Sequence, residues 1–264
     1  MTTYWIDGEW QVEPLSAGVT ARLAIATLPC PTAWVSTRSL LGAAVAADEL
    51  RHSASSLGHT VEDGDGLTRA IEALVTSSSS ELLQLALVPD QLPPSAADRW
   101  ERSRLVGWRH PAGTSPWTAI FSEWPVNNHS PAVGLRLTAS GEVLQGRRAA
   151  ETVGAHSALW GNLDAHLARF DEWSVIVEDD DKVLSTPRIR DGSPYDAWLD
   201  RLVTGGNVSR RAIPFSPESL SRPSVGLAAI APWGEAAPVV TSDAQRLSSI
   251  RASKRVQHLL STLD

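Results

Sequence analysis

The chain has 264 residues, of which 42% are hydrophobic, and this length can bury one large core or two smaller ones. The formal net charge of -7, with no block of lysine or arginine, argues against a nucleic-acid partner. No apolar run approaches the roughly 20 residues of a membrane-spanning helix, so no membrane partner is expected.

Cys30 is the only cysteine, so the chain cannot form an internal disulfide. Because proline flanks it on both sides, we expect a packed loop thiol rather than a nucleophile. Residues 1–10 lack the basic and apolar pattern of a secretory signal, which predicts a cytoplasmic protein. The histidines have no metal-ligand spacing, so no metal site is expected. The scarcity of lysine beside arginine suggests a bacterial genome rich in G and C.

The first third of the chain predicts a mixture of strands and helices. Residues 4–12 predict a hairpin that turns at Asp7-Gly8. Apolar residues at helical spacing predict helices over 40–57 and 65–75, and Gly58 is expected to end the first of them. Residues 82–88 predict a buried strand.

Closely spaced prolines after residue 88 suggest a boundary between two lobes. We expect an N-terminal α/β lobe over 1–94, a linker and loop region over 95–131 that contains a strand at 105–108, and a C-terminal α/β lobe over 132–264. In the C-terminal lobe, the pattern predicts helices over 149–169, 194–203 and 242–260, and strands over 173–177, 183–184, 225–231 and 238–240. This alternation of short strands and helices predicts an α/β (α+β) fold.

Four stretches carry a resemblance to a known family. They are Tyr4–Glu9, Glu49–Gly58, Val183–Gly192 with its Thr186-Pro187 pair, and Leu227–Val240. In this order and spacing, they resemble the class IV aminotransferases, the fold-type IV pyridoxal-phosphate enzymes. That group includes branched-chain and D-amino-acid aminotransferases and 4-amino-4-deoxychorismate lyase. The resemblance implies a two-lobed scaffold, a homodimer with its cleft near the subunit interface, and pyridoxal phosphate bound to a lysine.

The lysine that this resemblance requires has no counterpart at its expected place. By its surroundings, the matching position lies around Ser157, and a serine hydroxyl cannot form a Schiff base. Lys182 and Lys254 are the only lysines of the chain; the first falls in an acidic turn and the second in the terminal helix. The sequence therefore predicts that no pyridoxal phosphate is bound.

Other cofactor contacts of the family also lack counterparts. Where the family has a glutamate and an asparagine, only Glu172 and Ser174 stand nearby. The helix start that helps to hold the cofactor phosphate corresponds to Tyr195–Trp198, where Asp196 adds a negative charge. The late phosphate contact of the family corresponds to Ala229–Ala231, which offers no hydroxyl. Three separate losses favour a protein without the cofactor.

Five residues are candidates for the remodelled cleft. The resemblance puts Trp160 and Trp198 near the cleft, where their indoles either fill the volume of the cofactor, which we prefer, or stack on an aromatic ligand. Arg147 and Arg148 are paired cations that suit a small carboxylate ligand, although solvated surface arginines are the commoner case. Ser157 completes the set.

Two functions stay open at this point. The preferred one is a degenerate relative that has lost pyridoxal-phosphate catalysis and keeps a binding or structural role, or a cofactor-independent activity in the remodelled cleft. The alternative is an active pyridoxal-phosphate-dependent aminotransferase or 4-amino-4-deoxychorismate lyase. That alternative requires Lys182 or Lys254 to reach the cleft.

Overall fold

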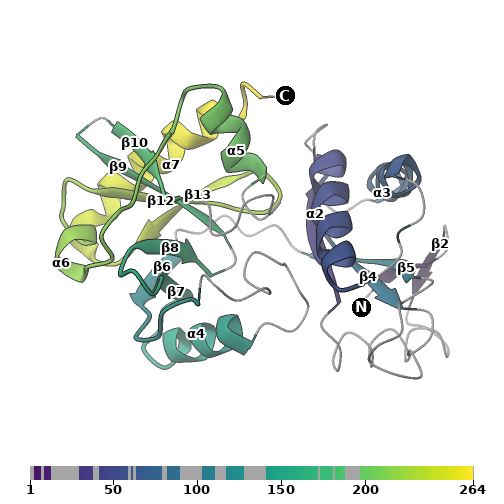
Figure 1. The fold of residues 1–264 in the computed structure, drawn as a ribbon, viewed down its shortest axis with the longest axis horizontal. Coiled ribbons are helices and arrows are strands. Elements are labelled where there is room, and N and C mark those ends of the chain that lie inside the picture. Colours follow the sequence, from purple (N-terminus) through teal and green to yellow (C-terminus); the bar gives the residue numbers. More distant parts are fainter. Residues whose placement is uncertain are drawn as a thin grey trace. The chain divides into compact units, whose positions relative to one another are not determined.

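A computed structural model of the chain describes residues 3–6, 9–12, 30–37, 42–58, 61, 64–78, 82–89, 103–110, 117–127, 141–171, 173–180, 182–187 and 197–263. The chain forms two compact units, Met1–Ala112 with Leu135–Ser140, and Gly113–Gly134 with Gly141–Asp264 (Figure 1). Both units combine strands and helices, which confirms the predicted α/β class.

The first unit contains an antiparallel five-stranded sheet. Its strands are β1 (Thr3–Ile6), β2 (Glu9–Val12), β3 (Thr32–Ser36), β4 (Leu82–Pro89) and β5 (Ser103–His110), in the spatial order β2-β1-β5-β4-β3. Strands β1 and β2 pair with Trp5 opposite Trp10, so the predicted hairpin strands are confirmed. The strand predicted over 82–88 is β4.

Two helices pack with this sheet into one core. They are α2 (Gly42–Ser56) and α3 (Gly64–Ser77), and both were predicted from the sequence. Leu50 of α2 and Ile71 of α3 are fully buried in the same cluster as Leu83 and Leu85 of β4. Helix α2 is rich in alanine, which has the highest helix propensity. Gly58 follows it with a φ of +79°, a backbone conformation that glycine adopts without strain.

The second unit contains a mixed eight-stranded sheet. In spatial order, its strands are β11 (Ser209–Arg210), β10 (Lys182–Ser185), β9 (Ser174–Asp179), β12 (Gly226–Ile230), β13 (Ala236–Val240), β6 (Trp117–Phe121), β7 (Ser157–Gly161) and β8 (Leu167–Phe170). The pairs β10–β11, β13–β6 and β6–β7 are parallel, and the others are antiparallel. The hairpins β9–β10 and β12–β13 match the strands predicted for this lobe.

The terminal helix covers one face of this sheet, and a hydrophobic core lies on the other. Helix α7 (Arg246–Leu260) follows a 3-10 turn (Asp243–Gln245) and packs on β12 and β13 (Figure 1). A Cβ at Gly226 of β12 would collide with the carbonyl oxygen of Ser248, so glycine is needed there for the helix to approach the strand. The opposite face carries Leu227, Ala229, Val175 and Val177 in a shared apolar cluster. The short helices α5 (Ala197–Thr204) and α6 (Pro217–Leu220) complete the unit.

The helix predicted over 149–169 is wrong for most of its length. Helix α4 runs from Gly141 to Glu151, and Gly154 follows with a φ of +74°, after which the chain enters β7 and β8. All five residues of β7 are buried, so this strand has no alternation of polar and apolar residues. A short apolar run of this kind does not distinguish a buried strand from a buried helix.

The segment 95–131, expected as a linker and loop region, contributes a strand to each sheet: β5 contains the strand predicted over 105–108, and β6 was expected as loop. Strand β5 pairs along its whole length with β4 in the first unit, and β6 pairs with β13 and β7 in the second. The start predicted for the helix over 194–203 falls partly outside the described residues, and α5 is observed from Ala197. In the part of the chain that the structure describes, no helix is both long and apolar enough to cross a membrane.

Candidate functional site

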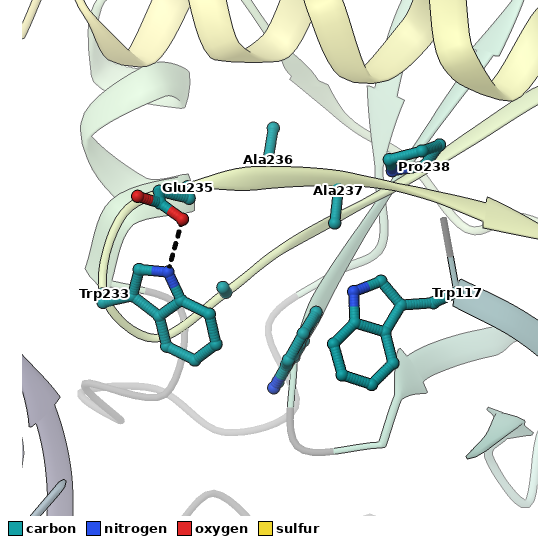
Figure 2. A pocket seen from close by; sticks show the side chains of 8 residues that line it. Trp117, Trp233, Glu235, Ala236, Ala237 and Pro238 are labelled. Atoms are coloured by element: carbon teal, nitrogen blue, oxygen red, sulfur yellow. Dashed lines mark hydrogen bonds between the residues drawn. The ribbon is translucent and has the colours of Figure 1, made fainter. Parts of the chain in front are cut away.

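Three tryptophans line a pocket in the second unit (Figure 2). Trp117 begins β6, Trp173 directly precedes β9, and Trp233 lies in the turn between β12 and β13. The pocket has a volume of about 80 Å³, and its other lining residues are Ala231, Glu235, Ala236, Ala237 and Pro238. Figure 2 shows the indoles of Trp117 and Trp233 on the side of β13 opposite α7, with Ala237 pointing toward that side and Ala236 pointing toward the helix.

The ring of Trp173 stands nearly perpendicular to the rings of Trp117 and Trp233. The ring centroids of Trp117 and Trp173 are 4.7 Å apart with an interplanar angle of 76°, and those of Trp173 and Trp233 are 5.4 Å apart at 80°. Phe170 extends this cluster with edge contacts to Trp117 and Trp173 at 6.3 and 5.8 Å. Edge-to-face pairs of this kind are favoured because the positive edge of one ring meets the negative face of the next. We call these three indoles, with their lining neighbours, the tryptophan pocket.

Two indole hydrogen bonds help to fix the turn that carries Trp233. The indole nitrogen of Trp233 donates to Oε2 of Glu235 over 2.8 Å, and Gly234 between them adopts a φ of +85° (Figure 2). On the other side of the turn, the indole nitrogen of the buried Trp198 donates to the carbonyl oxygen of Pro232 over 2.9 Å. A Cβ at Gly234 would lie 2.8 Å from Cζ2 of Trp198, so the Trp198 ring packs directly against the turn. Trp198 therefore positions the turn rather than lining the pocket.

Parts of three stretches that the family resemblance assigns to cofactor contacts lie at or beside this pocket, whereas Ser157, at the expected lysine position, does not line it. Trp173 lies between Glu172 and Ser174, and Ala231 ends the stretch that corresponds to the late phosphate contact; both line the pocket. Trp198 ends the stretch that corresponds to the phosphate-binding helix start, and it bonds to Pro232 beside the pocket. Glu172, Tyr195 and Asp196 lie outside the described residues.

The described lining of the tryptophan pocket does not fit pyridoxal phosphate. It consists of three indoles, three alanines, a proline and the Glu235 carboxylate, and it includes neither lysine nor arginine. A phosphate dianion is stabilised by cations or by a cluster of N–H groups, whereas a carboxylate repels it. The volume of about 80 Å³ is also far below the ~300–1,000 Å³ of pockets that enclose drug-sized ligands.

Neither lysine of the chain lies at the tryptophan pocket. Lys182 pairs with Asp179 at the far end of β9, six residues from Trp173, a separation of roughly 20 Å at about 3.3 Å per strand residue. A side chain with four methylene groups cannot span that distance. Lys254 is exposed on α7, which covers the opposite face of the sheet, and it is absent from the buried face of that helix.

A second polar cluster lies between α4 and the end of β8. Nε and Nη2 of Arg147 each lie 2.9 Å from Oδ2 of Asp171, which is only 5% exposed. Burial raises the pKa of the Asp171 carboxyl, and the charge and hydrogen bond of Arg147, together with the charge of Arg169, only partly offset this effect. The Arg169 guanidinium also lies 5.7 Å from the centroid of the Trp160 ring. This cluster joins the helix to the sheet.

The five predicted cleft candidates therefore separate into three groups. Ser157, Arg147 and Trp160 belong to the cluster around Asp171, and Trp160 is 1% exposed in a small core with Val126. Trp198 lies beside the tryptophan pocket. Arg148 is exposed on α4. Because adjacent residues of a helix point about 100° apart, Arg147 and Arg148 do not form one binding site.

A larger hollow of about 280 Å³ lies beside α4. Its lining is mostly apolar, and it includes Trp124 and Val153, which are 55% and 68% exposed. None of the predicted candidates lines it, and Glu123 is its only titratable lining residue. The tryptophan pocket is therefore the better candidate site, because parts of three stretches expected to contact a ligand lie at or beside it.

Sequence reasoning missed the residues that actually line this pocket. Trp117 and Trp233 come from segments 116 positions apart, and no local pattern links them. One signal was available, because Trp173 lies between two positions that the family resemblance marks as cofactor contacts. Asp171 gave no signal before the fold placed it against Arg147.

Comparisons with known proteins place the fold but not the activity. No family model matches the sequence, and no curated protein matches it either. Solved structures do match along nearly the whole chain. An aminotransferase from Brucella abortus, bound to the cofactor PLP, superposes with a TM-score of 0.74 and 14% identity, covering 99% of this chain and 98% of that one.

Two further structures show the same fold. The branched-chain aminotransferase of Escherichia coli has a TM-score of 0.71 and 14% identity, covering 99% of this chain and 93% of that one. A candidate 4-amino-4-deoxychorismate lyase from Legionella pneumophila has a TM-score of 0.69 and 15% identity, covering 89% and 91%. The chain therefore has the fold of the class IV aminotransferases, as the sequence resemblance predicted. At these identities, the likeness concerns the fold alone.

Proposed function

We propose that this chain keeps the fold-type IV scaffold but has lost pyridoxal-phosphate catalysis, and that it now acts as a ligand-binding protein through the tryptophan pocket. One observation carries this proposal. The pocket beside which parts of the expected cofactor stretches lie is lined by indoles and a carboxylate, and both lysines of the chain lie away from it. Without a lysine, the cofactor has no Schiff-base partner.

The alternative is an active aminotransferase or 4-amino-4-deoxychorismate lyase. The fold that the chain shares with the Brucella abortus aminotransferase bound to PLP favours it. This alternative needs Lys182 or Lys254 to bind the aldehyde, so it makes a definite chemical prediction.

The decisive test is incubation of the purified protein with pyridoxal phosphate, followed by visible absorbance, borohydride reduction and peptide mapping. We expect no stoichiometric absorbance band and no label that depends on the folded state. The matched control is the double variant Lys182→Ala/Lys254→Ala, which should behave as the wild type does. A labelling reaction in urea measures the background from exposed amines.

A stoichiometric label on Lys182 or Lys254 that disappears on unfolding would refute the proposed function. It would instead support the aminotransferase or lyase. Activity assays with amino donors and with aminodeoxychorismate would then distinguish between the two reactions.

We also propose that the chain is a cytoplasmic homodimer. The family resemblance supports the dimer, and the sequence pattern at residues 1–10 supports the location. Light scattering coupled to size-exclusion chromatography tests the first point. A particle with twice the mass of one chain is expected, and a monomer at all concentrations would contradict it.

A further inference from the structure

We propose that the tryptophan pocket binds a compact alkylammonium group, such as the trimethylammonium end of a choline-like molecule. This inference deepens the proposed function and rests on it, because it names a ligand for the pocket from which we infer that pyridoxal phosphate has been lost. It is carried by three features of the pocket: its rings, its charge and its size.

The rings form the walls of a cage. The ring of Trp173 stands at 76° to that of Trp117 and at 80° to that of Trp233, and all three indoles line the same cavity. A cation is attracted to the negative face of an aromatic ring, most strongly to tryptophan, and aromatic cages are the usual means of recognising quaternary ammonium groups. A neutral apolar ligand would gain burial in this pocket but not this attraction.

The charge of the pocket has one sign. Glu235 is the only charged residue among the described lining residues, and its Oε2 already accepts a hydrogen bond from Trp233 (Figure 2). That bond holds the carboxylate beside the rings without neutralising it. A carboxylate and an aromatic lining both favour a cation over an anion.

The size of the pocket excludes larger ligands. A volume of about 80 Å³ admits a compact head group, whereas it is far below the ~300–1,000 Å³ that encloses a drug-sized molecule. The rest of a ligand would extend out of the pocket. The indole nitrogen of Trp117 is buried and has no hydrogen-bond acceptor among the described residues, so a hydroxyl close to the ammonium group would give it a partner.

Choline and its neutral isostere 3,3-dimethylbutan-1-ol are the appropriate probes. The two have nearly the same shape and both carry a hydroxyl, but only choline is charged. In a proton NMR titration, we expect the choline methyl signal to move upfield with saturation, because the bound methyl groups lie over ring faces. We expect the isostere to bind at least tenfold more weakly, a difference of about 1.4 kcal/mol.

Two variants separate the charge from the rings. Glu235→Gln keeps an acceptor for the Trp233 indole but removes the charge, and it should weaken choline binding about fivefold without changing the affinity for the isostere. Trp233→Leu keeps apolar volume but removes one ring face, and it should lower the ratio of the two affinities. Glu151→Gln is the matched control, because Glu151 is exposed at the end of α4 and lines no part of the pocket.

Each other outcome overturns the inference. Equal affinities for choline and the isostere would show a general apolar pocket, and the absence of a saturable shift would show no ligand site for this group. An unchanged affinity ratio in both pocket variants would place the choline elsewhere. None of these results affects the proposed loss of the cofactor, whereas a fold-dependent label from pyridoxal phosphate would refute that proposal separately.

Discussion

The substitution Gly234→Ala should destabilise the protein, because the added Cβ would collide with the ring of Trp198. Gly234 lies in the β12–β13 turn with a φ of +85°, and a Cβ there would stand 2.8 Å from Cζ2 of Trp198 and 2.9 Å from its Cε2. The substitution therefore adds two costs. One is the positive φ itself, and the other is steric conflict with a buried ring.

Gly206 provides a control for the first cost. It has a φ of +74°, and a Cβ there would meet nothing within 4 Å. An L residue in this backbone region costs roughly 1–2 kcal/mol, so Gly206→Ala should lower the free energy of unfolding by about that amount. Overpacking a filled site costs typically ~1–3 kcal/mol, so Gly234→Ala should lower it by about 2–5 kcal/mol.

The measurement is urea unfolding of both variants, with the m-value checked for constancy. A third variant, Trp198→Leu, removes the atoms that would meet the new Cβ. In that background, Gly234→Ala should cost no more than Gly206→Ala does in the wild type. If the two glycine variants lose the same free energy in the wild-type chain, Trp198 does not support the turn and the reasoning fails.

Three further predictions concern the same unit. Gly146→Ala should cost about 1–3 kcal/mol of unfolding free energy, because its Cβ would lie 2.5 Å from Cζ2 of Trp160, and Trp160→Leu should relieve most of the loss. Gly226→Ala should cost at least as much, since the obstacle is the backbone oxygen of Ser248, which cannot rotate away; a thermal transition unchanged from the wild type would contradict this. Burial raises the pKa of Asp171 above its ordinary value of 3.8, so the folded state binds the proton more tightly than the unfolded state does. The contribution of Asp171 to the free energy of unfolding is complete below pH 3.8 and is lost as the pH rises through the raised pKa. The variant Asp171→Asn should therefore have a flatter dependence of unfolding free energy on pH over that window. If urea unfolding at several pH values gives the same pH dependence for the variant and the wild type, the assignment is refuted.

Elements with clear local signals were predictable from the sequence. Helix α7 and the hairpins β9–β10 and β12–β13 have turns and apolar spacing that act within a few residues. Strand β7 was not predictable in the same way. All of its residues are buried, and what makes it a strand is pairing with β6 and β8, which come from other parts of the chain.

The residues of the candidate site were also only partly predictable from the sequence. Trp198 was expected near the cofactor cleft from its place in the order of elements, and the structure places it beside the tryptophan pocket. Trp160 was expected there too, but it faces α4, where its ring lies against Gly146. Register within a strand decides which face a side chain takes, and a one-residue difference reverses it. No resemblance at 14–15% identity fixes register to that level.

The chemistry of the tryptophan pocket points to a ligand of opposite charge to the one that the fold suggests. A cofactor phosphate needs donors and cations around it, whereas the pocket presents ring faces and the Glu235 carboxylate. The charged groups of the two kinds of site are therefore opposite in sign: a cation attracts a phosphate and repels an ammonium, and the Glu235 carboxylate does the reverse. The Glu235 substitution is therefore informative in both directions: if the pocket still served an anion, Glu235→Gln would strengthen binding of inorganic phosphate, and if it serves a cation, the same change weakens binding of choline. The sign of that single effect tells which kind of ligand the pocket is built for.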